Sequence, residues 1–430
     1  MEEQAVNPGR LRQLTIGAWR QFERVDFAFD ARLTILTGAN GAGKTTILNI
    51  LAQPFGWNIP MASLPPGLAQ IASLLNGIWQ GALSAMLPGQ SSISTDAVTI
   101  GKLVYDEREI EVLIPINTER HTFTVELRPL VQARGIYIPS HRPVFVPIES
   151  KLRGRNSSMV AAHRQYVEAV RSAWMRTGSK AASDMPLEVL KRTLYAWASS
   201  EETLPFVIAF AEKLRIVLPA SLEFEMFTAM NNEVILNTGT GDFPLDAVSG
   251  GIAAMIDLTW HIFTYAAEAP SEPFIVLIDE PENHLHPEMQ RSVLPKLLHA
   301  FPSAQFVVAS HEPLVVTSVE SASVYALRYH DVPDQSLRRR AVYAEPLAEY
   351  NRAGTANEVL REVLGLGYTM PVWAANVIDS AVSTASAAGF SEEALSKLVG
   401  TLRDHALQDY GPQALEEVSR RANQSKAVRQ

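Results

Sequence analysis

The chain has 430 residues, of which 47% are hydrophobic and 19% charged, a balance typical of globular proteins and unlike that of disordered chains. The absence of cysteine excludes disulfides and cysteine-ligated zinc, and the net charge of −9 excludes nucleic-acid binding through an overall positive charge. Residues 1–10 lack the basic start and apolar core of a secretory signal peptide, so we expect a cytoplasmic protein.

Residues 11–37 predict strands, and the last of these runs directly into the glycine-rich loop GANGAGKT at 38–45. A helix-like stretch follows, so the order is the strand, loop and helix that a phosphate-binding P-loop requires. The loop N–H groups can surround an anion, the lysine can contact the outer phosphates, and the threonine hydroxyl can ligate Mg²⁺. We therefore predict an ATP and Mg²⁺ site formed by Gly38, Ala39, Asn40, Gly41, Ala42, Gly43, Lys44, Thr45 and Thr46.

The segment 45–95 contains no charged residue. Its centre, residues 67–87, is long enough to span a bilayer, but it contains Gln70, Asn76, Gln80 and several glycines and serines. We expect this segment to lie in the core or in a subunit interface and not in a membrane.

The middle and end of the chain predict further elements. Residues 98–127 alternate well enough for three antiparallel strands, and residues 157–215 predict helices with breaks near Gly178 and Pro186. Strands are expected again near Leu222–Phe227 and Val234–Leu236. Residues 355–425 predict helix throughout, with a cap at Ser391.

The stretch 151–192 is locally basic, with nine Lys or Arg residues against three acidic ones and with Tyr166 and Trp174 between them. It fits a contact with the phosphate backbone of DNA or RNA. A solvated helical face or a dock for an acidic partner also fits, and the sequence leaves these interpretations open.

Two apolar runs downstream end in polar residues. Residues 274–278 predict a buried strand that ends in Asp279 and Glu280, a Walker B pattern in which Asp279 holds Mg²⁺ and Glu280 acts as general base. Residues 305–309 predict a neighbouring strand that ends in Ser310 and His311, and His311 can sense the γ-phosphate.

A third segment, Ser249, Gly250 and Gly251, opens a helix-like run. A serine and free N–H groups at a helix start can bind an anion, including ATP held by another subunit. The same residues are also an ordinary helix cap.

Order and spacing together resemble ATP-binding-cassette ATPases of the RecF, SMC and OLD branch, over residues 11 to about 330. The opening LTIGAWRQFERVDFAFDARLTILTGANGAGKTTILNILA resembles that branch's start, and IVLIDEPENHLHPEMQ resembles its Walker B and D-loop. The segments at 249–251 and 309–316 resemble its signature and switch-histidine motifs, with Ile252 and Glu312 as departures. The segment IYIPSHRP at 136–143 resembles a further part of OLD-like members and ends in an arginine. No long coiled coil and no TOPRIM pattern is found, so the chain resembles a stand-alone OLD-like ATPase of the Septu and PARIS type.

The resemblance implies an α/β fold: an ABC-type P-loop ATPase head with a mixed sheet and an antiparallel β-subdomain, a helical insert and a helical C-terminal region. The expected divisions are 1–150 and 221–345 for the two halves of the head, 151–220 for the insert and 346–430 for the end. It also implies an oligomer in which ATP bridges two copies, and a separate nuclease or toxin subunit that the ATPase controls in anti-phage defence. A RecF-like clamp on DNA is the alternative, while a transporter subunit and a nuclease have less support.

Overall fold

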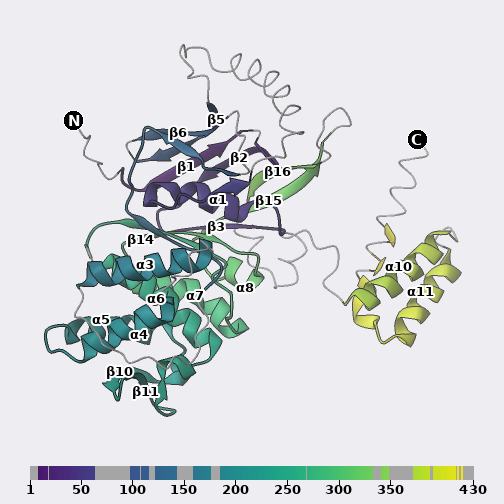
Figure 1. The fold of residues 1–430 in the computed structure, drawn as a ribbon. Coiled ribbons are helices and arrows are strands. Elements are labelled where there is room, and N and C mark those ends of the chain that lie inside the picture. The colour runs from purple at the N-terminus through teal and green to yellow at the C-terminus, as the bar shows by residue number, and fades with distance from the viewer. Residues whose placement is uncertain are drawn as a thin grey trace. The chain divides into compact units, whose positions relative to one another are not determined.

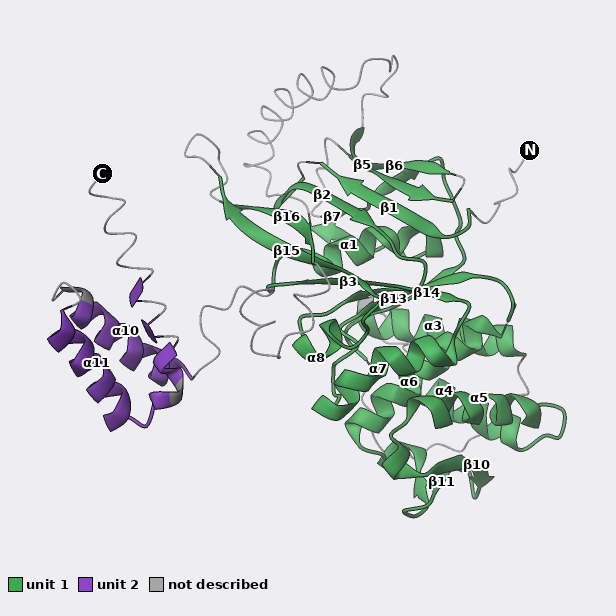
Figure 2. Ribbon diagram, turned by 180° about the vertical axis from the view of Figure 1, so that it is seen from behind, with its two compact units in different colours: residues 1–365 green, residues 366–430 purple. Residues whose placement is uncertain are grey.

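The computed structural model describes residues 8–17, 19–62, 97–106, 108–115, 122–142, 158–175, 185–267, 269–332, 340–347, 371–387, 391–412, 414–415 and 418–419. The chain divides into two compact units, Met1–Gly365 and Leu366–Gln430 (Figure 2). Each unit has a hydrophobic cluster of its own. The finer division into four segments stays a prediction.

A mixed sheet of eleven strands forms the centre of the first unit (Figure 1). The strands lie in the order β8-β6-β5-β1-β2-β16-β15-β3-β14-β13-β9. This arrangement, with helices packed on it, confirms the predicted α/β class and mixed sheet. The bounds are β1 Leu11–Ile16, β2 Phe22–Ala28, β3 Leu33–Gly38, β5 Ala97–Tyr105, β6 Glu109–Pro115, β8 Glu126–Arg128, β9 Gly135–Ile138, β13 Phe274–Asp279, β14 Ala304–Ala309, β15 Ser323–Asp331 and β16 Arg340–Pro346.

One side of the sheet is antiparallel. Strands β8, β6, β5, β1 and β2 pair antiparallel with one another. Along β6, Ile110 and Val112 are buried, while Glu109 is exposed and Glu111 only partly covered. This alternation is what a sheet with one covered face requires, and it confirms the antiparallel subdomain predicted from residues 98–127.

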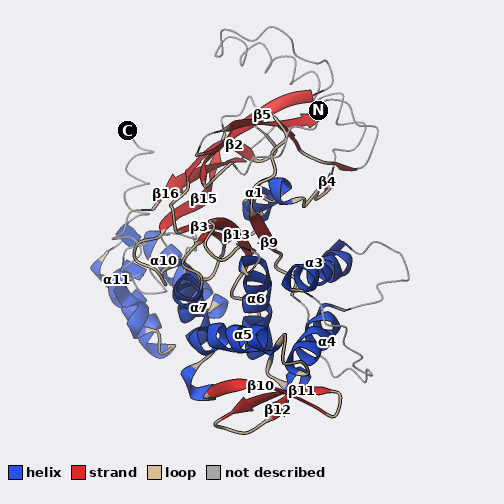
Figure 3. Ribbon diagram, turned by 90° about the vertical axis from the view of Figure 1, so that its left-hand side faces the viewer, coloured by secondary structure: helices blue, strands red, loops and turns tan. Residues whose placement is uncertain are grey.

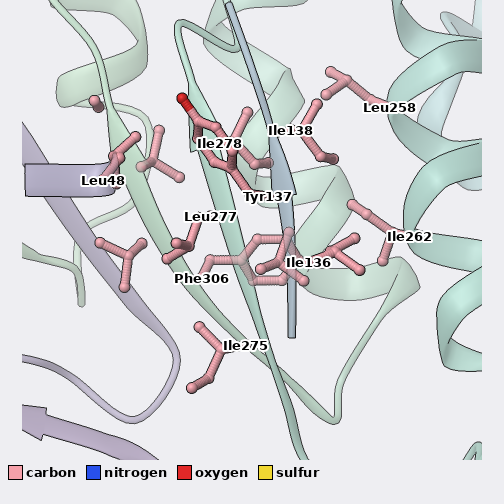
Figure 4. Packing of buried hydrophobic residues seen from close by; sticks show 14 of the residues in the cluster. Leu48, Ile136, Tyr137, Ile138, Leu258, Ile262, Ile275, Leu277, Ile278 and Phe306 are labelled. Atoms are coloured by element: carbon pink, nitrogen blue, oxygen red, sulfur yellow. The ribbon is translucent and has the colours of Figure 1, made fainter. Parts of the chain in front are cut away.

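The other side of the sheet is parallel and positions the candidate site. Strands β15, β3, β14, β13 and β9 run parallel, and every residue of β3, β13 and β14 is buried. Figure 4 shows side chains of β9, β13 and β14 between Leu48 on one side and Leu258 and Ile262 on the other. Strands covered on both faces need such continuous apolar runs. Their carboxyl ends reach one edge of the sheet, which is where ligands bind in parallel sheets.

Helices cover both faces of this parallel part and extend into a second lobe. Figure 3 shows α4, α5 and α6 between the large sheet and a small sheet of β10, β11 and β12. These elements confirm the helices and strands predicted over 157–236, although residues 176–184 lie outside the described residues. The bounds are α1 Lys44–Leu51, α3 Met159–Met175, α4 Pro186–Ala198, α5 Leu204–Val217, α6 Gly250–Ala266, α7 Pro287–Ala300, α8 Pro313–Val316, β4 Met61–Ala62, β7 Thr122–Phe123, β10 Phe224–Met230, β11 Glu233–Thr238 and β12 Phe243–Pro244, with 3₁₀ turns at Gln53–Phe55, Ala220–Leu222 and Leu245–Ala247.

The second unit is helical. It contains α10 (Val372–Ala387), α11 (Glu392–Asp404) and a 3₁₀ turn at Gln408–Tyr410. Residues Ile378 and Val382 of α10 are buried with Leu398 and Leu402 of α11, and the spacing of four within each pair is that of one helix face. The Ser391 hydroxyl accepts a hydrogen bond from the N–H of Ala394, as the predicted cap requires. Residues 355–370 lie outside the described residues.

The basic stretch 151–192 differs from the expected nucleic-acid surface where it is described. Tyr166 is fully buried, and Trp174 packs edge-on against Trp57 and Tyr137, so neither aromatic ring is free to stack on a base. Arg171 lies over the ring of Trp57, and Lys191 is 1% exposed. The two aromatic residues therefore do not support the nucleic-acid interpretation, because their rings pack in the core beside the sheet. The basic residues 151, 153, 155, 176 and 180 lie outside the described residues.

The uncharged segment is described only in its first part. Residues 45–62 contribute Ile47, Leu48, Leu51 and Trp57 to the main core, as expected for a buried segment. Residues 63–96 lie outside the described residues. Of the helices that the structure describes, none is long and apolar enough to cross a bilayer.

A buried ion pair joins α4 to the turn that precedes α6. The ammonium of Lys191, on α4, lies 2.9 Å from Asp246 Oδ2 and 2.5 Å from Glu233 Oε2. Asp246 is also buried, and it belongs to the turn just before Ser249. A buried charge is stable only with a partner, so this pair holds the turn against α4.

Replacing Lys191 by methionine removes the ammonium that forms an ion pair with the buried Asp246 carboxylate. Breaking one side of a buried pair costs about 3–5 kcal/mol, and we expect a loss of this order in the free energy of unfolding from urea titration. The matched control is Lys102→Met, because Lys102 pairs with Glu109 at the surface with side chains 46% and 55% exposed. The control should lose less than about 1 kcal/mol. Equal losses in the two variants would contradict the assignment.

Candidate nucleotide-binding site

The glycine-rich loop joins β3 to α1 in a conformation that only glycine adopts readily. Gly38, Gly41 and Gly43 have φ of 136°, 81° and 103°. A Cβ on Gly43 would lie 2.4 Å from the ring of Phe22, and one on Gly38 would lie 2.5 Å from the carbonyl oxygen of Leu327. Both sterics and backbone conformation therefore require glycine at these positions. The loop runs into the N-terminus of α1, as the P-loop pattern predicted.

Lys44 is 7% exposed and turns back onto its own loop. Its ammonium donates to the carbonyl oxygens of Gly38 at 2.8 Å and Ala39 at 3.2 Å. Burial lowers the pKa of Lys44, and the nearby carboxylates of Asp279 and Glu280 oppose that shift. The side chain thus braces the loop and holds a positive charge opposite the acidic end of β13.

Thr45, at the start of α1, and Asp279, at the end of β13, lie in contact although 234 positions separate them in the sequence. The Thr45 hydroxyl donates to Asp279 Oδ2 at 2.9 Å. Asp279 is 2% exposed, and its other oxygen, Oδ1, has no hydrogen-bond partner. Burial is the main cause that raises the pKa of Asp279 to about 6; the charges of Glu280 and Glu282 act in the same direction, and the Thr45 hydrogen bond and the Lys44 charge oppose them. A hydroxyl beside an unpartnered carboxylate oxygen is the hard-oxygen donor set that suits Mg²⁺.

Glu280 follows directly, in the turn after β13, with an unusual φ of 49°. Its Oε2 accepts a hydrogen bond from Asn283 Nδ2 at 3.0 Å. The ring atom Nδ1 of His311 lies 3.6 Å from Glu280 Oε1 and 3.5 Å from Glu282 Oε1. The side chains of Glu280 and His311 remain 32% and 42% exposed, so both can reach a ligand at the mouth of the P-loop.

Glu282 is a site residue to which the sequence analysis assigned no role. Its side chain is 5% exposed, and its Oε1 accepts from the Ser310 hydroxyl at 2.9 Å and from the N–H of His311 at 3.3 Å. Burial raises the pKa of this carboxyl. Glu282 therefore links the ends of β13 and β14 and holds His311 beside Glu280. Its only signal in the sequence was a third acid in the run DEPE at 279–282.

The segment of Ser249, Gly250 and Gly251 lies outside the cluster formed by the P-loop, Asp279, Glu280 and His311. Ser249 caps α6, with its hydroxyl accepting from the N–H of Ile252 at 3.5 Å, and both Ser249 and Gly250 are exposed. A Cβ built on Gly251 would lie 3.2 Å from the carbonyl oxygen of His284. Among the hydrogen bonds of the described residues, none joins this segment to residues 38–46. The fold thus brings together the P-loop, Asp279, Glu280 and His311, and leaves the segment at 249–251 exposed at the start of α6.

Two family models match parts of the chain. One, described as "AAA domain, putative AbiEii toxin, Type IV TA system", matches residues 187–317, which include Ser249, β13 and β14. The other, described as "AAA domain", matches residues 13–63, which include the P-loop. The two matches fall on the two parts of the chain that meet at Thr45 and Asp279.

Two curated relatives share part of the sequence. The "Retron Vc95 probable ATPase" of Vibrio cholerae serotype O1 biovar El Tor is 30% identical over 125 residues, which are 29% of this chain and 24% of that relative. The "Septu protein PtuA" of Bacillus thuringiensis is 24% identical over 163 residues, which are 36% of this chain and 40% of that relative. The matches thus span less than half of each relative.

A solved structure, the SMC head domain from Thermotoga maritima, aligns with 79% of this chain and 99% of its own, at 14% identity and a TM-score of 0.40. The chain therefore combines P-loop and Walker B motifs with partial similarity to AAA-domain family models, to a probable ATPase of a retron and to a Septu protein.

Replacing Asp279 by asparagine should stabilise the protein without nucleotide or metal. Because the folded-state pKa of about 6 exceeds the ordinary value of 3.8, the stability that Asp279 contributes is complete below pH 3.8 and is lost as pH rises through 6. At 1.36 kcal/mol per pKa unit, the gain on substitution should be about 3 kcal/mol at pH 8 and about half of that at pH 5. Urea denaturation in EDTA at pH 5 and pH 8 measures this gain in the free energy of unfolding. An equal gain at the two pH values, or a loss at pH 8, would contradict the account.

Proposed function

We propose that this protein binds Mg²⁺ and ATP between its P-loop and the acidic end of β13, and hydrolyses the ATP there. The observation that carries the proposal is the bond between Thr45 and Asp279, with Glu280 and His311 beside it. Lys44 and the loop N–H groups would hold the phosphates, while Thr45 and Asp279 would hold the cation. Bound Mg²⁺ would neutralise charge that develops on the phosphate oxygens.

Glu280 is the general base in this proposal. Its carboxylate is exposed enough to meet a water molecule, and Asn283 fixes one of its two oxygens. The free oxygen, Oε1, can accept the proton of the attacking water. His311, which Glu282 holds beside Glu280, would donate a hydrogen bond to the γ-phosphate.

The exposed segment at 249–251 suggests that the complete site needs two copies of the chain. Ser249 and the first N–H groups of α6 face solvent, and they can contact the phosphates of ATP bound by a second copy. ATP would then stabilise the closed dimer, and hydrolysis would release it. The coupling arises because ATP binds the closed state more tightly than the open one.

The third part of the proposal concerns a partner. Two relatives are named as a probable ATPase of a retron and a Septu protein, so we infer that this protein is a cytoplasmic ATPase that controls a separate nuclease or toxin in anti-phage defence. The helical unit Leu366–Gln430 has its own core and is the segment that we assign to partner binding. The RecF-like alternative depends on the basic stretch, in which Tyr166 is buried and Trp174 is partly buried against the core.

Replacing Glu280 by glutamine removes the base and keeps the shape of the side chain. General-base catalysis contributes about 10²–10⁴-fold, so we expect phosphate release to fall by at least 10²-fold while ATP affinity is retained. Light scattering should show a longer-lived dimer with ATP. The control Lys44→Ala should lose ATP affinity itself. Wild-type turnover by the Glu280→Gln protein would remove Glu280 from the mechanism.

The partner is tested by expressing the tagged chain with its neighbouring genes and recovering the complex under native conditions. We expect a stoichiometric nuclease or toxin on a multimeric ATPase core, identified by mass spectrometry and particle mass. The matched variant lacks Leu366–Gln430 and should lose the partner but keep ATP binding. Recovery of the ATPase alone, or with replication and repair factors, would favour the RecF-like clamp instead.

A further inference from the structure

Arg142 lies buried behind the site, in the segment that follows β9. Its guanidinium donates hydrogen bonds to four backbone carbonyl oxygens of one turn. These belong to Asp279 at 3.4 Å, Glu280 at 2.5 Å, Pro281 at 3.2 Å and Asn283 at 3.2 Å. The turn carries the proposed base, so one side chain holds the backbone on both sides of Glu280.

This turn needs such a contact. Glu280 has a φ of 49°, which is uncommon for a residue with a side chain and persists only where the surroundings hold it. Buried carbonyl oxygens also need donors. A guanidinium offers five N–H groups in a planar fork, whereas a lysine ammonium has three hydrogens at one point. Arginine can therefore reach all four carbonyls at once, and lysine cannot.

The same segment holds the Glu280 side chain as well. Asn283 Nδ2 donates both to the carbonyl oxygen of Ser140 and to Glu280 Oε2, each at 3.0 Å. Ser140 is two residues before Arg142, so the end of β9 fixes the turn through the backbone and the carboxylate through Asn283. Two independent contacts from one segment thus determine where the Glu280 carboxylate points.

The electrostatic surroundings support this arrangement. Burial lowers the pKa of Arg142, and the charges of Asp257, Glu282, Asp279 and Glu280 oppose that shift. Asp257 lies on α6 and is buried, and its carboxylate accepts a hydrogen bond from the Tyr166 hydroxyl. The guanidinium therefore lies within electrostatic range of the site acids on one side and of α6 on the other.

We propose that Arg142 is a positioning residue, which fixes the turn at 279–283 so that the Glu280 carboxylate faces the P-loop. The inference rests on the proposed role of Glu280 as base. It assigns Arg142 no contact with ATP and no proton transfer. Its loss should therefore slow the chemical step and loosen the turn, while ATP binding persists.

The test is Arg142→Lys in the full chain, compared with wild type and with Arg171→Lys. Arg171 is a matched control, because it is half-buried over Trp57 and makes none of the bonds to the 279–283 turn. Displacement of a catalytic group by about 1 Å can cost 10²-fold, so we expect kcat to fall by 10- to 100-fold with ATP affinity within about threefold. Without nucleotide, hydrogen exchange should speed up in peptides covering 279–285 and stay unchanged in α10. The control Arg171→Lys should change neither kcat nor the hydrogen exchange at 279–285.

The exchange measurement separates this inference from the proposed function, because it needs no ATP. Unchanged exchange at 279–285 in Arg142→Lys would overturn the positioning role whatever the activity. An unchanged kcat in Arg142→Lys, together with an inactive Glu280→Gln, would also overturn the positioning role. An active Glu280→Gln would instead overturn the proposed role of Glu280 as base. If Arg142→Lys does not fold, the charge-balanced variant Arg142→Gln with Asp257→Asn takes its place under the same expectations.

Discussion

Three carboxylates crowd the end of one buried strand, and the site is organised around that repulsion. Asp279, Glu280 and Glu282 lie within four consecutive residues, and two of them are almost fully buried. Lys44 and Arg142 place positive charge on either side, and hydroxyls from Thr45 and Ser310 supply hydrogen bonds. Like charges at this spacing are costly in a low-dielectric interior. A bound cation with its nucleotide would reduce the repulsion among these carboxylates, and this reduction would favour binding.

The sheet makes this crowding possible. Strands β3, β14, β13 and β9 are neighbours, although they come from the start, the middle and the later part of the chain. Their carboxyl ends bring the P-loop, His311, the acids of 279–282 and Arg142 to one edge. The segment at 249–251 is separate, since α6 packs against the helical lobe and begins beside His284. The same fold therefore presents one nearly complete half-site and one exposed segment suited to the other half.

The sequence predicted those parts of the site that come as contiguous patterns. GANGAGKT and the run ending in Asp279 and Glu280 each combine a strand with polar residues at its end, so position follows from pattern. The sequence did not predict contacts between distant segments. Glu282 contacts Ser310 only because β13 and β14 pair in the sheet. Arg142 donates to backbone carbonyl oxygens that lie 137 to 141 positions away in the sequence. The sequence left the role of the stretch 151–192 open, because composition does not reveal that Tyr166 and Lys191 are buried and that Trp174 packs against the core.

The central claim, that two copies share each ATP site, is tested most directly by mixing two inactive variants. Lys44→Ala disables the P-loop, and Ser249→Arg disables the segment that serves the other copy. In a mixed dimer one site keeps both an intact P-loop and an intact Ser249. Mixing should restore ATP hydrolysis to about a quarter of the wild-type level, since half of the dimers are mixed and one of two sites works in each. No recovery in mixtures shown to contain mixed dimers, or full activity of Ser249→Arg alone, would contradict the account.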